Sequence, residues 1–519
     1  MAEEGKQVGH KPPFYYRNLW RNLILLALSV FCAPFSAAVC LLSMVALKLH
    51  GQRNTTFSRA DKEHDVAIQQ RKTILVTGVS MAKGLAIARN LSQHTPHRIV
   101  GADISPLSPG RFSHAIVKYY CLDAPSGEDA EPYIDSILHV IQSEKVHLWI
   151  SCSSVAAAVE DGQVVRLAEE QAQAEGRRFE AIQFREDVVA RLHEKDQFIE
   201  YMESLNLPVP ESHRCTDAQE ALDVLMRELH RTPTKANSAS SRKSKAEARK
   251  QFIMKPIGVD DKARRNMMTL LPFPSTEATT QYIRSLGISE TNPFQMQQFI
   301  QGKEYCTHAL VVRGQVKAFT SCPSSELLMH YEPLPAHSAL SQAMLAFTQR
   351  VCAEGGESFT GHLSFDFLVK EEDDVQLYPI ECNPRVHTAV VLFEQTPELA
   401  DAYLSIFDDA TCTSKSPALF PRTPTHGYFW LGHDLVASGI LPILDRLFGQ
   451  GSWDDVVVGL LSLWRHWIYW KDGTFTLEDP WPFFALYHVY WPVKFVESIA
   501  RGQGWSRFVM DCSGTRLLC

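Results

Sequence analysis

Apolar and polar residues are distributed differently in three parts of the chain: an uncharged segment near its start, an α/β middle and an aromatic-rich end. Residues 23–47 contain no Asp, Glu, Lys or Arg. A helix of this length extends about 37 Å, enough to cross a hydrocarbon layer of about 30 Å. The run also exceeds the roughly 7 to 15 apolar residues of a cleaved signal peptide, which is the alternative interpretation. The pattern therefore predicts a membrane segment over residues 23–47, between an N-terminal tail (1–22) and a linker (48–71).

The residues flanking this segment do not define its orientation. Basic side chains stand on both sides of it, namely Lys6, Lys11, Arg17 and Arg21 before it and Lys48, Arg53, Arg59 and Lys62 after it. The positive-inside rule therefore gives a near tie. Pro34 lies mid-segment and can either kink one spanning helix or break the segment into a shallow hairpin with both flanks on one side. The even flanks favour the hairpin.

The middle of the chain has the pattern of a parallel sheet with crossover helices. A β-rich run at residues 73–77 is followed by a glycine turn at Gly78 and a small-residue helix after Gly84, and further strands are expected at 97–102 and 146–151. This predicts a doubly wound α/β fold. An acidic residue, Asp103, ends the second strand as in dinucleotide sites, but the two glycines do not form GxGxxG, so a nicotinamide-dependent reductase is the weaker interpretation. The serines and cysteine at 151–154 either line a pocket or form a turn.

The aromatic end begins after Gly427, where eight of the ten tryptophans lie. Amphipathic rings favour the boundary between water and lipid, so this region is expected either to lie in the membrane surface or to form an aromatic packing subdomain. A polar stretch at 231–250, rich in Ser, Lys and Arg, is expected to be a surface insert, with contact to an anionic lipid surface as the alternative.

Composition narrows the function classes. The chain has 519 residues, enough for two to four structural units, and 51 Lys and Arg against 59 Asp and Glu give a net charge of −8, which disfavours nucleic acid as the main partner. The twelve cysteines are scattered without a CxxC pair, which favours reduced thiols over a disulfide framework or a cysteine-based zinc site. The body of the protein is therefore expected on the cytosolic side of a membrane.

The candidate chemistry lies in residues 361–385, which read as two strands around a charged turn. If Asp373 and Asp374 form the loop, Asp366 stands directly opposite Glu381. Because residues i and i+2 of a strand share a face, Asn383 joins them. Three oxygen donors then converge, and two carboxylates so close should repel each other unless a cation such as Mg²⁺ lies between them. The alternative is a pair of acidic residues exposed on an edge strand.

Together with residues upstream, this hairpin resembles the ATP-grasp superfamily. HEKDQF, FIMKP, QQFIQGKE and ECNPR occur in the family's order between residues 72 and 410. The resemblance implies an ATP-grasp domain at 186–410 after a Rossmann-like pre-ATP-grasp domain at 72–185, with the Trp-rich region at 411–519. It also implies roles for individual residues: Lys195 and Lys255 on nucleotide phosphates or the adenine side, the Phe299 and Ile300 backbone on adenine, Glu304 on ribose, Asp366, Glu381 and Asn383 on Mg²⁺, and Arg385 on the γ-phosphate or acyl phosphate.

Two features depart from the family pattern. Gln297 or Gln298 stands where many members have a hinge glutamate, and the loop at 256–266 lacks the usual glycine and serine residues. Since backbone groups make most hinge contacts to adenine, the first departure should be mild. In the loop, Arg264 or Arg265 is expected to replace the missing phosphate donors through charge-assisted bonds, unless the pair is simply solvated.

The resemblance implies a ligase that uses ATP and Mg²⁺, with Mn²⁺ as a substitute. A carboxylic acid would be activated as an acyl phosphate and captured by an amine or amino acid. The alternative is a membrane-tethered, nucleotide-binding scaffold without catalysis. His308, His362 and His387 are candidates for a base toward the amine or are structural, whereas Cys306 and Cys382 are expected to be buried strand residues. With its membrane segment and Trp-rich tail, the chain further resembles fungal ATP-grasp enzymes of secondary-metabolite clusters, those of the fumisoquin-type alkaloid pathway among them. The acid, the amine and the oligomeric state stay open.

Overall fold

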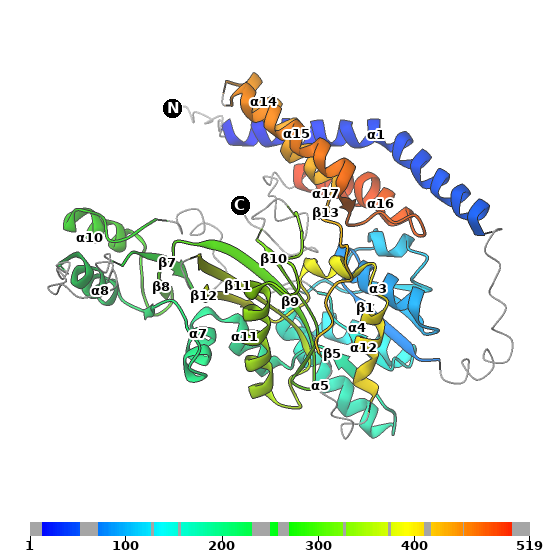
Figure 1. Cartoon of the computed structure of the whole chain (residues 1–519), viewed down its shortest axis with the longest axis horizontal. Helices are drawn as coiled ribbons and strands as arrows, with labels where there is room; N and C mark the ends of the chain where they lie inside the picture. Colours follow the sequence, from blue (N-terminus) through cyan, green and yellow to red (C-terminus); the bar gives the residue numbers. More distant parts are fainter. Residues whose placement is uncertain are drawn as a thin grey trace, which may run out of the picture.

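The computed structural model describes residues 13–51, 71–125, 129–153, 157–230, 250–257, 269–324, 329–371, 375–408, 417–449 and 451–500. Within these ranges the chain forms four sheets, of five, four, three and two strands, together with helices (Figure 1). The α/β class predicted from the sequence is confirmed. Ser154, the insert at 231–249, Arg264, Arg265 and the hairpin residues Asp373 and Asp374 lie outside the described ranges.

The five-stranded sheet is parallel throughout. Its order is β3 (Lys118–Cys121), β2 (Arg98–Asp103), β1 (Thr73–Thr77), β4 (Leu148–Ile150) and β5 (Glu180–Ile182). The parallel sheet expected between residues 72 and 185 is therefore confirmed. A short η1 (Pro109–Phe112) precedes β3.

Helices cover both faces of this sheet because successive strand residues point to opposite sides. Ile74 and Val76 of β1 pack in the same core as α3 (Ala82–His94). Leu75 packs on the other side, in the core that includes α4 (Glu131–Ser143) and α5 (Ala158–Ala174).

The glycines after β1 are explained by close packing. Gly78 has φ +70°, and a Cβ placed on it would stand 2.4 Å from the Cys152 carbonyl oxygen. A Cβ on Gly84 would stand 2.6 Å from the Gly78 carbonyl oxygen. The Asp103 carboxylate accepts the Ser80 backbone N–H at 2.8 Å and so holds the same turn. Because Asp103 and both glycines have structural tasks here, the turn gives no support to a dinucleotide site.

Two antiparallel sheets follow in the chain after α6 (Glu186–His193) and α7 (Lys195–Ser204). The three-stranded sheet has the order β6 (Ser212–Cys215), β8 (Phe294–Gln298), β7 (Phe252–Pro256) and packs with α8 (Ala218–His230) and α10 (Thr276–Ser285). The four-stranded sheet has the order β10 (Gln315–Pro323), β9 (Lys303–Val312), β11 (Gly361–Glu371), β12 (Val375–Asn383) and packs with α7 and α11 (Ala339–Gly355). The helices η3 (Thr388–Phe393), α12 (Glu398–Leu404) and η4 (Ser405–Phe407) link the four-stranded sheet to the parallel one.

The C-terminal region is mainly helical. Its elements are β13 (Tyr428–Phe429), α13 (Leu431–Asp434), the π-helix η5 (Leu435–Ile440), α14 (Leu441–Leu447), α15 (Trp453–Tyr469), β14 (Lys471–Asp472), α16 (Trp481–Ala485), the π-helix η6 (Leu486–Tyr490) and α17 (Trp491–Ala500). In Figure 1 these helices lie beside α1 (Pro13–Gly51), on one side of the sheets. The aromatic residues Phe483, Tyr487 and Trp491 form a core there together with Leu25 of α1.

The apolar N-terminal segment is one continuous helix. α1 contains Pro34 and bends near its middle in Figure 1, as a proline that removes a helix hydrogen bond would cause. The hairpin favoured by the sequence is therefore wrong, because the helix continues through the proline. By length and composition the segment 22–49 could cross a membrane, and only 11% of its most apolar window is buried. One such helix is by itself weak support for a membrane segment.

A buried ion pair fixes the C-terminal region to the parallel-sheet unit. Arg89 of α3 donates from Nε to Asp479 Oδ2 at 2.8 Å and from its terminal nitrogens to the backbone oxygens of Thr474 and Asp479. Ser113 Oγ and the His114 N–H donate to the same carboxylate. Both charged side chains are more than nine-tenths buried. The polar groups of this contact are therefore satisfied only while the two regions stay together.

We expect Arg89→Met to destabilise the protein by about 3 kcal/mol, because it leaves the Asp479 carboxylate buried without its cation. Chemical unfolding of the detergent-solubilised full chain, followed by tryptophan fluorescence, measures the change. Arg166 makes an exposed ion pair with Glu170 and serves as the matched control. Arg166→Met should change stability by less than about 0.5 kcal/mol. Equal effects of the two substitutions would contradict this role of Arg89.

Candidate active site

The site begins with the register of β11 and β12. Near the turn, Phe367 pairs with Pro379, whereas one residue further along Asp366 pairs with Glu381. Ile380 is the extra residue of a β-bulge, next to a proline that cannot donate to the ladder. Without the bulge, Asp366 would pair with Ile380, and the Glu381 side chain would point to the other side of the sheet. The predicted pairing of Asp366 with Glu381 is confirmed, but it depends on this bulge rather than on a uniform ladder from a two-residue loop.

The oxygen donors predicted on the hairpin do converge. Asn383 Nδ2 donates to Asp366 Oδ2 at 3.2 Å, and a terminal nitrogen of Arg385 donates to Asn383 Oδ1 at 3.1 Å. The pKa of Asp366 is raised to about 7, mainly by burial and in addition by the neighbouring Glu381 and Glu304 carboxylates, whereas Arg385 and Lys255 oppose the shift. The site thus concentrates negative charge where water is scarce.

Cations reach the same place from the three-stranded sheet and from α7. Lys255 Nζ on β7 donates to Gln297 Oε1 on β8 at 2.7 Å. The pKa of Lys255 is lowered to about 8, mainly by burial and in addition by Lys195 at the start of α7, while Glu381, Glu304 and Asp366 act in the opposite direction. Because the charges of Lys195 and of the hairpin carboxylates each change the pKa of Lys255, both lysines lie within electrostatic range of the acidic hairpin. Gln297, noted in the sequence only as a departure, is the residue that orients Lys255.

The segment after β8 holds the remaining predicted residues. The Phe299 N–H donates to the Gln251 carbonyl oxygen at 2.7 Å, so this amide is already engaged by the neighbouring strand. Ile300 is buried, and Glu304 at the start of β9 is exposed and accepts a hydrogen bond from Ser324 Oγ at 2.8 Å. An adenine placed here would have to use the Phe299 carbonyl or the Ile300 backbone rather than the Phe299 N–H.

Of the three histidines near the site, His308 and His362 are buried and His387 is half-buried, and they are largely occupied by structural contacts. Burial lowers the pKa of His308 and of His387 to about 3. His387 Nδ1 accepts the Ala389 N–H and caps η3, and His362 Nε2 lies 2.8 Å from the Tyr403 hydroxyl. Groups with such low pKa values are weak bases at neutral pH, so the structural interpretation is favoured. Cys306 and Cys382 are buried in strands, as expected.

The sequence analysis missed Lys83. This buried lysine in the first turn of α3 donates from Nζ to the carbonyl oxygens of Ser153 and Val386, each at 3.3 Å. It therefore connects the end of β4 with the segment that follows Arg385. Ser151 Oγ donates to Asp161 Oδ2 at 2.6 Å in a buried network, which supports a structural task for this turn. A lone lysine in a small-residue helix gives no sequence signal that could have identified it.

The residues present fit Mg²⁺ and a phosphate chain. Asp366, Glu381 and Asn383 offer the hard oxygen ligands that Mg²⁺ prefers. Among the described residues the buried Nε of Arg385 has no hydrogen-bond partner, which an anionic ligand would supply. The oxygen ligands of the hairpin and the unpaired guanidinium nitrogen of Arg385 thus both indicate a ligand that contains Mg²⁺ and phosphate.

Comparison with known proteins gives only weak similarity. No protein-family model matches the chain, and no curated protein matches it in sequence. Solved structures that resemble it include N5-carboxyaminoimidazole synthetase from Staphylococcus aureus complexed with ADP (14% identity, 67% of this chain and 79% of that one, TM-score 0.43) and L-amino acid ligase from Bacillus licheniformis (12%, 64% and 74%, 0.40). Carboxyaminoimidazole ribonucleotide synthase from Aspergillus clavatus complexed with ATP is a third (12%, 70% and 82%, 0.43). At these scores the similarity supports no conclusion about function, which depends on the residues of this chain.

We expect Asp366→Asn to stabilise the metal-free protein by about 1 kcal/mol above pH 7, because it removes a charge from a half-buried acidic cluster. The folded-state pKa of Asp366 is raised, so the free-energy cost of keeping this carboxylate ionised in the folded protein is fully present above pH 7. The cost disappears as the pH falls toward 4, and the two proteins should converge there. Unfolding midpoints between pH 4 and 8 in a chelating buffer measure the difference. A less stable variant at pH 8 would contradict the strain assigned to this carboxylate.

Proposed function

We propose that the protein is an ATP- and Mg²⁺-dependent ligase that activates a carboxylic acid as an acyl phosphate for capture by an amine or amino acid. One observation carries the proposal: the oxygen ligands of the β11–β12 hairpin converge where Lys255 of the facing sheet, Lys195 of α7 and Arg385 also meet. The half-buried acids and bases of this site lose hydration that their mutual attraction need not repay, and a ligand that carries charges of both signs compensates both. A nucleotide–metal complex is such a ligand.

The residues divide this work according to their charge. Asp366, Glu381 and Asn383 would hold Mg²⁺, which supplies charge neutralisation for the β- and γ-phosphate oxygens when bound. Lys255, held by Gln297, and Lys195 would bind phosphate oxygens on the opposite side. Glu304, exposed beside the hinge, would accept hydrogen bonds from ribose hydroxyls. Mn²⁺ has similar ligand preferences and would substitute for Mg²⁺.

Arg385 is the residue we propose at the reacting phosphate. Its Nε is buried without a partner among the described residues, and its other end is fixed by Asn383. Attack of a carboxylate on the γ-phosphate places added negative charge there, which a positioned guanidinium stabilises. Lys83 holds the Val386 carbonyl next in the chain and so positions Arg385. The amine would then displace phosphate from the acyl phosphate, giving an amide, ADP and phosphate.

We expect Glu381→Gln to lower acid-dependent ADP release by about 100-fold or more, because a lost metal ligand removes several kcal/mol of charge stabilisation. The assay uses the full chain in detergent with Mg²⁺, ATP and pooled amino acids and aromatic acids. Glu357 is an exposed carboxylate in the turn before β11 and provides the matched control. Glu357→Gln should retain full activity.

The same assay tests the alternative of a scaffold without catalysis. Tight Mg²⁺-dependent ATP binding without acid-dependent ADP release, in wild type and Glu381→Gln alike, would contradict the ligase. Binding is measured separately by calorimetry with a non-hydrolysable ATP analogue. A variant that binds the analogue but releases no ADP would show that the hairpin serves the reaction rather than the fold.

The membrane location is a further part of the proposal. α1 contacts α16, η6 and α17, and its polar contacts with them run from Ser29, which donates to the Tyr487 carbonyl oxygen, to Met44, which accepts from Trp481 Nε1. If α1 crossed a bilayer, those helices would have to enter the hydrocarbon beside it. We therefore propose that α1 lies in the plane of the membrane surface, with the body on the cytosolic side where ATP is available.

Exposed apolar side chains support this arrangement. They gather on the layer made by α1, α14, α15 and α17, which Figure 1 shows on one side of the sheets. Strongly exposed members include Val30, Phe31, Phe35 and Leu42 of α1, Leu447 of α14, Phe448 directly after it, and Val458, Leu461, Trp464 and Trp467 of α15. Aromatic and aliphatic residues in one layer suit a water–lipid boundary.

A role of the ligase in secondary-metabolite biosynthesis is supported only by the sequence resemblance, and it is part of the proposed function.

We expect protease added outside sealed vesicles to remove both an N-terminal and a C-terminal epitope tag, because an in-plane helix leaves both ends on the ATP side. Vesicles reconstituted so that the protein binds ATP added outside provide the orientation control. Protection of the N-terminal tag alone would show that α1 spans the bilayer and would contradict the in-plane arrangement. Trp467→Glu, on the exposed face of α15, should in addition weaken flotation with the vesicles.

A further inference from the structure

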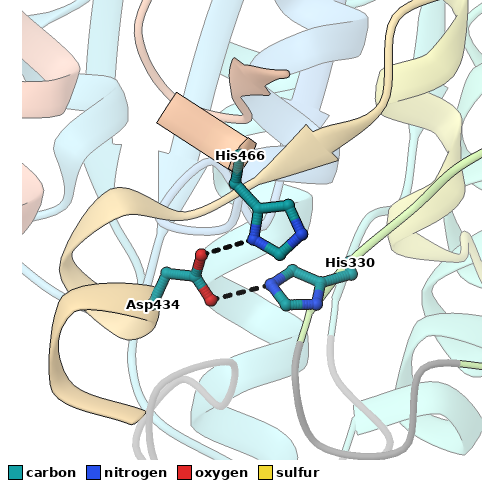
Figure 2. A group of neighbouring side chains, drawn as sticks. All are labelled: His330, Asp434 and His466. Atoms are coloured by element: carbon teal, nitrogen blue, oxygen red, sulfur yellow. Dashed lines mark hydrogen bonds and ion pairs between the residues drawn. The ribbon is translucent and has the colours of Figure 1, made fainter. Parts of the chain in front are cut away.

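A second cluster of metal-ligand residues lies apart from the acidic hairpin, in the C-terminal region. Figure 2 shows His330, Asp434 and His466 with their polar atoms turned toward one another. His330 Nε2 lies 2.8 Å from Asp434 Oδ1, and His466 Nδ1 lies 2.7 Å from Asp434 Oδ2. One carboxylate is thus approached by two imidazoles, one at each oxygen.

Three separate segments supply these side chains. His330 belongs to the segment between β10 and α11, Asp434 ends α13, and His466 is in the last turn of α15. Asp434 is fully buried, and the two imidazoles are about nine-tenths buried. Neither α13 nor the end of α15 needs these polar contacts to form its own helix. The cluster therefore stabilises the contact between the three segments.

The spacing is close to that of a coordination sphere. The candidate ligand atoms all lie within 4.8 Å of one another. Neighbouring ligands of an ion bonded at about 2.1 Å stand roughly 3.0 to 3.4 Å apart. The observed N–O distances of 2.8 and 2.7 Å would therefore open by about half an ångström to admit an ion between the carboxylate and the two rings.

The rings around the cluster restrict how the imidazoles can turn. The Trp470 ring lies 4.5 Å from His466 and 5.6 Å from His330 between centroids, and the Phe429 ring lies 5.8 Å from His466. The two histidine rings are 4.3 Å apart. Aromatic neighbours exclude water and keep the ring nitrogens directed at the carboxylate, as a preorganised site requires.

We propose that His330, Asp434 and His466 bind a divalent transition-metal ion, with Zn²⁺ as the natural occupant. Imidazole nitrogen favours Zn²⁺ over Mg²⁺, so this site and the all-oxygen hairpin select different ions. The ion would fix α13 and the end of α15 to the segment that follows β10 of the four-stranded sheet. Its task is structural, and it is independent of the ligase proposal.

The competing explanation is a hydrogen-bonded triad without metal, in which each imidazole donates one N–H to Asp434. The two explanations differ in metal content. Full-length protein is loaded with Zn²⁺ in the presence of excess Mg²⁺, which occupies the oxygen-ligand site, and is then dialysed against metal-free buffer. Zinc per chain is measured by mass spectrometry for wild type, His330→Gln, His466→Gln and the matched control His426→Gln, an exposed histidine of the same region.

Wild type and His426→Gln should retain about one zinc per chain, and the two ligand variants at least tenfold less. Wild type loaded with Co²⁺ should show the visible absorption of an ion with nitrogen and oxygen ligands, and a chelator should lower its unfolding temperature. The Co²⁺ spectrum of wild type decides the question even if the variants fold poorly. Retention of no zinc by wild type together with no Co²⁺ spectrum, or equal zinc in all four proteins, would overturn the proposal.

Discussion

The position of one strand residue determines whether this protein has an acidic site at all. Asp366 and Glu381 share a face of the hairpin because Ile380 bulges out of β12 and shifts the register by one. Side chains alternate strictly along a strand, so the unshifted ladder would send Glu381 to the opposite side. The bulge therefore creates the carboxylate pair, and the adjacent Pro379, which lacks a backbone donor, tolerates the break in the ladder.

The Asp366–Glu381 carboxylate pair destabilises the metal-free protein, and the rest of the site offsets this effect. Asp366 lies among other carboxylates in a half-buried position that raises its pKa, while Lys255 lies in a half-buried position that lowers its own. The two groups come from different sheets. A ligand with metal and phosphates would satisfy the acids and the bases together, which is why the arrangement fits a nucleotide better than a purely structural ion pair. The Arg89–Asp479 pair, by contrast, has each polar group satisfied within the chain.

The sequence predicted those parts of the structure that depend on local patterns. The strand at 73–77 and the parallel sheet around it follow from hydrophobic runs and a glycine turn. The hairpin pairing was predicted from a uniform ladder, but three residues separate the strands, and the bulge at Ile380 compensates for the difference. The continuous helix through Pro34 was missed because the equal number of basic residues on the two flanks contains no information about packing. In the structure α16 and α17 pack against α1 and support it as one helix. Residues distant in sequence, such as His330 and His466, gave no spacing signal at all.

The central claim is that the carboxylate of an acid attacks the γ-phosphate of ATP in this site. It is tested most directly with acids that carry ¹⁸O in both carboxylate oxygens, supplied as a pool of amino acids and aromatic acids with ATP and Mg²⁺. Our account predicts that one ¹⁸O atom is transferred to the inorganic phosphate for each ADP formed. Release of ADP with unlabelled phosphate only would show that water, and not a carboxylate, attacks ATP, and would contradict the account.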